Sequence, residues 1–423
     1  MTPDERWPLP KRVLFRFWFT YIVFYSLPEN GKVSVLSWVP GADWVMTPYT
    51  KFWHAICPWI AIHIFHLSGQ RTTYFPTGSG DTTLGYIENL AFLVVAALAG
   101  LVWSVFDRRR LEYRWLNGWL RMLIRYTLAF TLFAYGFAKV FPLQFQPPRL
   151  FKLVQPYGEF SPMGVLWNFM GASLPYTMLA GAAEVLGGLL LLFRRTTTLG
   201  ALVSFGALAN VVALNFCYDV PVKLYSSNLL IMAAYLAAGD ARRLANVFLL
   251  NLPAEPAEPE PPRFENKRFR IAAMALWTVL VGYVLFTNIR GGWTGYKETY
   301  LHPTRPPLYG LYRAESFTRT GGTPLTADAA PWQKVEFQSQ FVSVRLADDT
   351  VSRFGVNYSP RQSTLTLNKS DTLQWSRPDD SRVILKGTLN GGAVTIELRQ
   401  IDTSKFLLLN RGFHWINELP FNR

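Results

Sequence analysis

The chain has 423 residues, of which 50% are hydrophobic and 17% charged, and its formal net charge is +14. Soluble domains carry roughly 25% charged residues, so this deficit indicates a protein that lies largely in lipid. The Lys and Arg residues flank apolar segments, as membrane topology signals do, and we expect the lipid bilayer rather than a nucleic acid as the partner.

Seven apolar stretches are predicted to cross the bilayer as helices, which takes about 17–25 residues each. They cover residues 13–28, 86–106, 122–142, 174–193, 197–217, 224–240 and 270–289. Basic residues gather in every second connection, for example at Arg108 to Arg110 and at Arg194 and Arg195. The positive-inside rule then places the N-terminus in the cytoplasm, and seven spans place the C-terminal part outside.

Residues 52–67 form a further apolar run, which is interrupted by Pro58 and carries three histidines. A span here would reverse the side of every later basic loop, so we expect a re-entrant or interfacial helix on the outer face. His63 and His66 share a helical face, but interfacial histidines commonly need no ligand. We therefore expect no metal site.

Two smaller features have structural interpretations. Asp81, Thr82 and Thr83 precede the second span and are interpreted as a helix cap. Cys57 and Cys217 belong to no Cys-x-x-Cys pair. Two buried, inert thiols are the favoured interpretation of these cysteines, and a disulfide between them is the alternative.

The last third of the chain changes character. Residues 253–262 are Pro-rich and are expected to form a stiff cytoplasmic linker. Beyond residue 300, short alternating runs separated by turn signals cover residues 335–338, 341–346, 352–356, 364–367, 372–375, 383–389 and 394–398. Evenly spaced short strands predict an antiparallel meander closed into a barrel or a sandwich. The dense segment 411–418 is expected to plug or cap this domain.

The expected fold class is a mainly α membrane protein, a polytopic helical bundle followed by an antiparallel β-barrel or sandwich domain. Residues 1–121 are expected to hold two spans and the interfacial segment, and residues 122–241 a four-helix unit. Residues 242–299 would form the linker and the last span, and residues 300–423 an extracytoplasmic β-domain.

Glu184 is the most informative polar residue. It lies about ten residues inside its predicted span, roughly 15 Å deep at 1.5 Å per residue. A carboxylate there costs a few kcal/mol, so it must face the bundle, find a partner or stay protonated. It is either a proton-handling or ligand-gripping acid or a packing residue paired with a neighbour. Lys139 either extends to the outer headgroups or turns inward toward Glu184, with Tyr135 one turn before it on the same face.

Polar residues continue from the outer half of the fifth span into the turn after it, at Asn210, Asn215, Asp219 and Lys223. Separately, Asn210 could bond across helices, and Asp219 and Lys223 could be surface turn residues. One polar pocket, shared with Lys139 and Glu184 and open to the outer face, would account for all of them.

Two motifs carry a family resemblance: Tyr-Gly-Phe-Ala-Lys at residues 135–139, and Ala-Glu-Val-Leu-Gly-Gly at residues 183–188 before the basic turn at 194–195. On these residues the block from 124 to 241 resembles the four-helix unit of the DoxX family of bacterial membrane proteins. The resemblance implies a multi-pass protein of the bacterial plasma (inner) membrane, linked to quinone-coupled or thiol redox chemistry. Lys139 and Glu184 fall on the family's characteristic positions, whereas the lack of a Cys-x-x-Cys motif argues against dithiol chemistry.

Three functions remain open. In the first, the protein is a component of a membrane oxidoreductase system and binds a quinone or another lipid-soluble ligand. Glu184 would exchange a proton, Lys139 would hold the ligand's oxygen or tune Glu184, and Asn215 and Asp219 would line the mouth. In the second, the bundle is non-catalytic and anchors a β-domain that binds a ligand or a redox or envelope protein partner. The third, a small-solute transporter, is disfavoured because the sequence shows no internal repeat.

Overall fold

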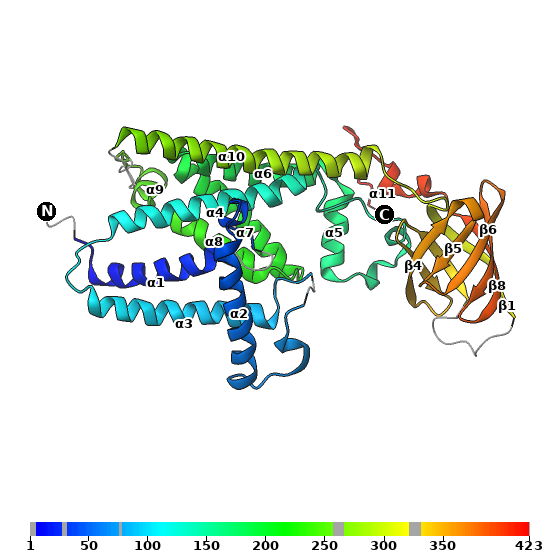
Figure 1. Cartoon of the computed structure of the whole chain (residues 1–423). Helices are drawn as coiled ribbons and strands as arrows, with labels where there is room; N and C mark the ends of the chain where they lie inside the picture. The colour runs from blue at the N-terminus through cyan, green and yellow to red at the C-terminus, as the bar shows by residue number, and fades with distance from the viewer. Residues whose placement is uncertain (1–5, 28–31, 76–77, 257–265, 321–330, 423) are drawn as a thin grey trace. The chain divides into compact units, whose positions relative to one another are not determined.

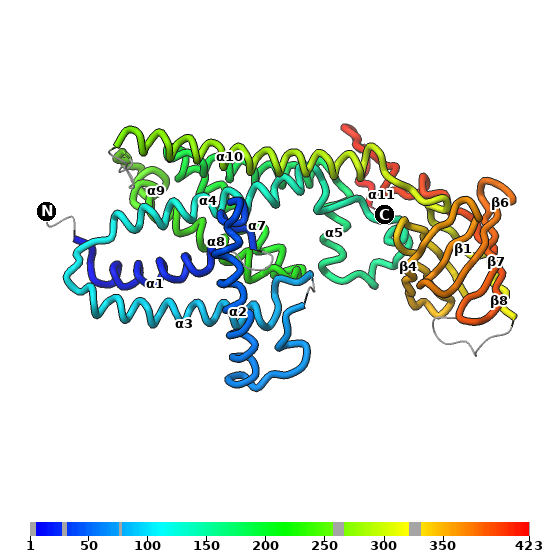
Figure 2. The backbone as a smooth tube through the Cα atoms, viewed as in Figure 1, coloured from blue at the N-terminus to red at the C-terminus, as the bar shows by residue number. Residues whose placement is uncertain are grey.

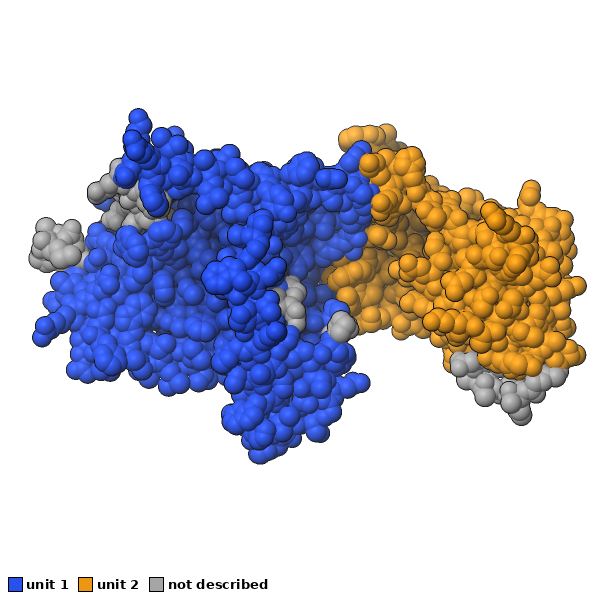
Figure 3. All heavy atoms as spheres, viewed as in Figure 1, with its two compact units in different colours: residues 1–144, 175–295 blue, residues 145–174, 296–423 orange. Residues whose placement is uncertain are grey.

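The structure, shown in Figure 1, is a computed structural model that describes residues 6–27, 32–75, 78–256, 266–320 and 331–422. It divides into two compact units, residues 1–144 with 175–295 and residues 145–174 with 296–423, which Figure 3 colours separately. The first unit is helical and the second contains the β-sheet. Residues 145–174, which interrupt the predicted four-helix unit, thus cluster with the β-domain.

Each of the seven predicted spans corresponds to a helix, which ends one or two residues before the predicted span in several cases. The helices of the first unit are α1 (Leu9–Ser26), α2 (Asp43–His63), α3 (Thr83–Phe106), α4 (Arg114–Val140), α6 (Leu174–Leu192), α7 (Thr197–Cys217), α8 (Lys223–Ala238), α9 (Ala241–Phe248) and α10 (Lys267–Tyr296). Figure 2 shows α1, α3, α4 and α10 running along one common direction, whereas α2 runs across them. The predicted linker is described in part: residues 253–256 lack regular secondary structure, and 257–262 lie outside the described residues.

Four helices are long and apolar enough to cross a membrane among the described residues. They are α3, α6, α7 with the turn before it (Arg194–Cys217), and α10 with its extension to Leu301. The other three predicted spans differ from these in composition or length. Helices α1 and α4 carry several basic residues each, and α8 has 16 residues. Length and composition therefore support four spans, fewer than the seven predicted.

Helix α2 contains the segment predicted to be re-entrant or interfacial, and it begins earlier than expected, at Asp43. Pro48 and Pro58 lie inside the helix and do not end it. One face buries Trp53, Cys57 and Ala61 at a spacing of four residues, while the side chains between them are exposed or half-buried. Such one-sided burial, with an axis across the other helices, suits a helix that lies on a bundle's surface.

The β-domain is a closed barrel of eight antiparallel strands in sequence order, with β1 paired to both β2 and β8. The strands are β1 (Gly310–Thr320), β2 (Trp332–Phe337), β3 (Phe341–Leu346), β4 (Val351–Ser359), β5 (Thr364–Leu367), β6 (Asp371–Asp379), β7 (Arg382–Leu389) and β8 (Gly392–Gln400). The predicted barrel or sandwich is a barrel. The first strand was not among the predicted runs, and a register shift between Ala314 and Ser316 interrupts its alternation.

Strand side chains fill the barrel interior. Leu365, Leu373, Leu385 and Ile396 are each 0% exposed and belong to one apolar core. The prediction that residues 411–418 plug or cap the barrel is wrong, because these residues lie exposed, Trp415 at 91%. A lumen already packed by its own strands has no space for a terminal plug.

Residues 145–174 cover the outer face of β2 and β3. They contain two short turns, η4 (Lys152–Val154) and η5 (Tyr157–Glu159), and the helix α5 (Pro162–Ala172). The Phe151 backbone N–H donates to Glu336 Oε1 over 3.2 Å, and Arg345 donates to Glu159 Oε1 over 3.0 Å. Glu336 and Arg345 are 0% and 3% exposed although they point away from the barrel core. This cover explains why β3 is buried on both faces.

Candidate functional site

A buried ion pair joins α4 to α6. Lys139 Nζ donates to Glu184 Oε1 over 2.9 Å and to Glu184 Oε2 over 2.8 Å. Lys139 is 6% exposed and Glu184 4%. The sequence left two orientations for Lys139, outward to the headgroups or inward toward Glu184, and in the structure the side chain turns inward. Both lone charges are thereby compensated in a region where an isolated charge would be costly.

Glycines allow the two helices to approach closely enough for this pair. A Cβ on Gly181 would lie 2.6 Å from the Gly136 carbonyl oxygen and 2.6 Å from Lys139 Cβ. A Cβ on Gly136 would lie 2.8 Å from a Val185 methyl group and 3.0 Å from the Gly181 carbonyl oxygen. In the two motifs, the glycines therefore set the distance between α4 and α6, and the Lys139–Glu184 pair connects the two helices.

Tyr135 touches both the ion pair and an open cavity. Lys139 Nζ lies 5.8 Å from the centroid of the Tyr135 ring. The same side chain lines a cavity of about 380 Å³, together with Val33, Ala134, Ala138, Leu143 and Gln144. The Gln144 Oε1 atom is buried and has no hydrogen-bond partner among the described residues. The cavity walls are thus largely apolar, and two of the lining residues, Tyr135 and Gln144, carry polar groups.

The start of α8 holds the loop before α3. Asp81 accepts hydrogen bonds from the backbone N–H groups of Lys223 (2.8 Å) and Leu224 (3.0 Å). Thr82 accepts from the Gly85 N–H over 3.1 Å and caps α3 as predicted. The interpretation of Asp81 as part of that cap is wrong, because Asp81 caps α8, a helix more than 140 residues away in sequence.

The next residues of α8 each reach a different neighbour. Ser226 Oγ accepts from Asn215 Nδ2 of α7 over 2.9 Å. The Tyr225 hydroxyl accepts from the Val33 backbone N–H over 3.1 Å and lies 3.4 Å from Thr131 Oγ1 of α4. The Tyr225 ring is 6.3 Å from that of Tyr135. The first two turns of α8 therefore connect the cavity region to α4 and α7.

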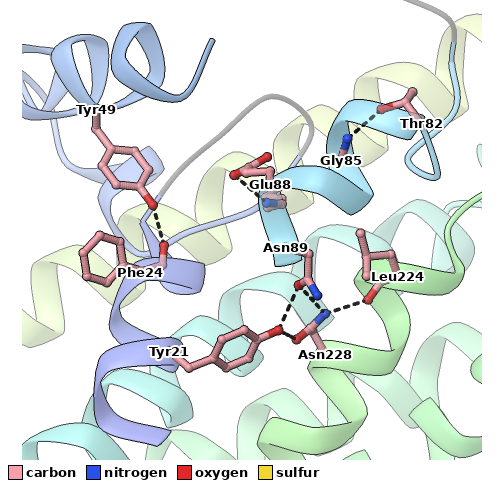
Figure 4. A network of polar contacts seen from close by, with 10 residues as sticks. Tyr21, Phe24, Tyr49, Thr82, Gly85, Glu88, Asn89, Leu224 and Asn228 are labelled. Atoms are coloured by element: carbon pink, nitrogen blue, oxygen red, sulfur yellow. Dashed lines mark hydrogen bonds and ion pairs between the residues drawn. The ribbon is translucent and has the colours of Figure 1, made fainter. Parts of the chain in front are cut away.

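A third polar contact joins α8 to α1 and α3 (Figure 4). The Tyr21 hydroxyl contacts Asn228 Oδ1 and lies 2.9 Å from Asn89 Oδ1. Asn228 Nδ2 donates to the Leu224 carbonyl over 2.9 Å. We did not predict roles for Tyr21, Asn89, Tyr225 or Asn228. The polar run Lys-Leu-Tyr-Ser-Ser-Asn at 223–228, which opens an apolar segment, is the signal that could have revealed this cluster.

The predicted single polar pocket divides into separate contacts. Asn215 is buried, but it bonds Ser226 rather than the ion pair. Asp219 is exposed and pairs with Lys223 Nζ over 2.7 Å, while Asn210 is exposed on α7. Among the described residues, the structure brings together Lys139, Glu184 and Tyr135. Asp219 and Lys223 pair with each other elsewhere, and Asn210 is exposed.

Three arginines that served as topology signals are buried in the bundle. Arg125 donates to the Leu191 carbonyl over 3.0 Å and the Leu192 carbonyl over 3.2 Å, at the end of α6. Arg16 donates to Tyr113, to Ser104 and to the Asp107 carbonyl at the end of α3. Arg121 lies beside Asp240, where α8 ends. These side chains satisfy or lie close to groups at helix C-termini, where positive charge is favourable.

The cysteines and histidines form no further site in the part of the chain that the structure describes. Cys57 and Cys217 are not bonded to each other, and Cys57 is buried whereas Cys217 is exposed. The disulfide alternative is therefore wrong, and so is the burial expected for Cys217. No group of three or more potential metal ligands is found among the described residues.

Comparison with known proteins yields one informative relative. No family model matches the chain, and no solved structure matches it. The chain is similar to a protein described as uncharacterized protein YwoB, from Bacillus subtilis (strain 168), with 32% identity over 133 residues. The match covers 29% of this chain and 79% of YwoB. Since it extends over most of that relative, the chain belongs to the same protein family as YwoB.

Proposed function

We propose that this protein binds a lipid-soluble, oxygen-bearing ligand such as a quinone, in the cavity beside Tyr135, as a component of a membrane oxidoreductase system. The observation that carries the proposal is the contact of one side chain with two features. Tyr135 lines the cavity of about 380 Å³, and its ring lies 5.8 Å from the ammonium group of the buried Lys139–Glu184 pair.

The cavity lining suits an apolar ring that carries oxygen atoms. Ala134, Ala138, Leu143 and Val33 supply apolar walls, and Gln144 and Tyr135 supply the polar groups. Ligand sites are commonly cavities of about 300–1,000 Å³ with apolar walls and a few polar groups that fix orientation. The uncommitted amide of Gln144 and the Tyr135 hydroxyl would hold the ligand's oxygen atoms.

The ion pair would supply a proton reservoir next to the ligand. A bound quinone would contribute the redox chemistry, while the protein's groups hold the ligand and move protons. Glu184 would exchange the proton, and Lys139 would orient the carboxyl group and tune its affinity for the proton. Tyr135 would connect the pair with the ligand, since it touches both.

The membrane arrangement proposed with this function has seven spans, an N-terminus in the cytoplasm and the barrel outside, in the bacterial inner membrane. The buried arginines support the alternation of helix direction. Arg125 in the first half of α4 meets the end of α6, and Arg121 lies next to the end of α8. The resemblance to the DoxX family motivates the redox assignment. The filled barrel lumen disfavours the alternative in which the barrel encloses a small ligand.

The test is to purify the full chain in mild detergent, extract it with organic solvent, and identify the extracted lipids by absorbance and mass. Ala138→Leu would fill the cavity, and Tyr135→Phe would remove its hydroxyl. Ala275→Leu on the exposed face of α10 is the matched control for added bulk. Glu184→Gln tests whether ligand retention depends on the pair, provided the variant remains folded.

The proposal expects a quinone or other isoprenoid at about one molecule per chain, retained in Ala275→Leu and lost in Ala138→Leu. Bulk phospholipid alone, identical in all the folded variants, would contradict it. That result would leave the Lys139–Glu184 pair with a purely structural role.

A further inference from the structure

The C-terminal segment 407–421 exposes an unusual amount of apolar surface. Trp415 is 91% exposed, Leu419 80%, and Phe413 and Ile416 are both 77% exposed. Leu407, Leu408 and Leu409 are also exposed, at 48%, 57% and 45%. Contiguous apolar surface of this kind in a soluble domain marks an interaction site.

The rest of the barrel does not share this property. Among the described residues between 302 and 406, Val351 is the one large apolar side chain that is exposed to a similar degree. The strands place their apolar residues in the barrel core, and apart from β2 and β3, which residues 145–174 cover, most of their polar residues are exposed or half-buried. The exposed apolar surface therefore belongs to the segment 407–421 specifically.

Contacts within the segment give it a defined shape. Asn410 Nδ2 donates to the Ser404 carbonyl over 2.7 Å, at the end of the short helix α11 (Leu407–Asn410). Arg411 Nη2 donates to Asn417 Oδ1 over 2.6 Å, and the Arg411 guanidinium lies 3.9 Å from the Phe421 ring centroid. The segment is thus held by its own polar groups while its large apolar side chains point outward.

The chain itself brings this segment near a bilayer. Helix α10 and its extension form a candidate span that ends at Leu301, and β1 begins at Gly310. A connection of this length reaches at most about 3.6 Å per residue, so the barrel is tethered within a few nanometres of the membrane that α10 crosses. Such tethering gives a surface-binding segment a high effective concentration at the bilayer.

We propose that residues 407–421 insert their apolar side chains into the headgroup region of the bilayer that α10 crosses. Trp and other aromatic residues prefer this zone, where the ring is partly in hydrocarbon and partly hydrated. Arg411 and the exposed Lys405 supply positive charge for lipid phosphate groups. The segment acts as a second, interfacial attachment of the barrel, independent of the ligand cavity in the helical unit.

The test uses the full chain in nanodiscs that contain anionic lipid. Cys217→Ser removes the exposed thiol, and the buried Cys57 remains. Trp415→Cys and Leu419→Cys place an environment-sensitive fluorophore on the segment, and Lys386→Cys on the exposed face of β7 is the control. Each label is quenched in turn by nitroxide-bearing lipid and by iodide in the water phase.

The expected result is several-fold stronger quenching by nitroxide lipid, and several-fold weaker quenching by iodide, for both segment labels than for the Lys386→Cys label. Iodide quenching equal to that of the control would show a segment in water and would overturn the proposal. Protection from both quenchers would also overturn it, because the segment would then be covered by protein.

Discussion

Lys139 and Glu184 form a two-point contact between α4 and α6, with Nζ–O distances of 2.9 and 2.8 Å and both side chains almost fully buried. The contact exists because Gly136 and Gly181 let the helix backbones approach one turn away from it. The charges are therefore part of a packed helix crossing. The contribution of these two charges to stability can be measured separately from any role in ligand binding or proton transfer.

Removing one partner of this pair should destabilise the protein more than removing both. Glu184→Gln leaves the buried Lys139 ammonium group without an opposite charge, and Lys139→Met does the same to the Glu184 carboxylate. Removing one partner of a buried ion pair typically lowers the free energy of unfolding by about 3–5 kcal/mol. The double variant Lys139→Met/Glu184→Met should recover much of the loss. Thermal unfolding of the full chain in mild detergent measures this, and additive losses in the double variant would contradict it.

Gly181→Ala should force α4 and α6 apart. The new Cβ would lie 2.6 Å from the Gly136 carbonyl oxygen, which is backbone and cannot rotate away. Overpacking of this kind costs about 1–3 kcal/mol. Gly206→Ala on α7 is the matched control, because its Cβ meets nothing within 4 Å. Unfolding midpoints should fall for the first variant only, and equal midpoints would refute the close crossing.

Asp81→Ala should cost about 0.5–2 kcal/mol, the usual range for loss of a helix N-cap. Asp81 accepts from two backbone N–H groups at the start of α8, so both would lose their partner. Asp219→Ala removes a carboxylate from the same region, but that side chain is 82% exposed and should matter little. The same unfolding assay compares them, and equal effects of the two substitutions would argue against the cap.

The contact between Glu159 and Arg345 should weaken in acid. Hydrogen bonds from the Arg345 guanidinium hold the pKa of the Glu159 carboxyl below its usual value. Because the folded-state pKa is the lower one, the contact stabilises the protein above the unfolded pKa of about 4.3 and is lost as pH falls through the folded value. Hydrogen exchange of residues 149–160, corrected for its intrinsic pH dependence, should rise across that window.

Arg345→Ala should show fast exchange in this segment at every pH, without the acid step. Arg382→Ala is the control. Arg382 is half exposed and pairs with Asp379 over 3.5 Å, in the hairpin of β6 and β7. An acid step that persists in Arg345→Ala would assign the pH dependence to a different group.

The strands after residue 331 could be predicted closely because each runs with a period of two between clear turn residues. The predicted run 341–346 coincides with β3, and 364–367 coincides with β5. Strand β1 escaped prediction because a register shift breaks its alternation, and its pairing with β8 is visible only once the barrel closes. The packing of residues 145–174 on β2 and β3 could not be predicted either, because its contacts join residues about 185 positions apart in the sequence.

The sequence by itself determined the apolar segments, the strand pattern and the two residues of the ion pair. Those features depend on local hydrophobicity and on the cost of placing a charge in an apolar helix, which leaves Glu184 few alternatives to a partner such as Lys139. Only the tertiary structure decided which polar groups meet: Asp81 with the start of α8, Arg125 with the end of α6, and Asn215 with Ser226. The physical reason is that hydrogen bonds are directional and short, so partners distant in sequence are chosen by how the helices pack.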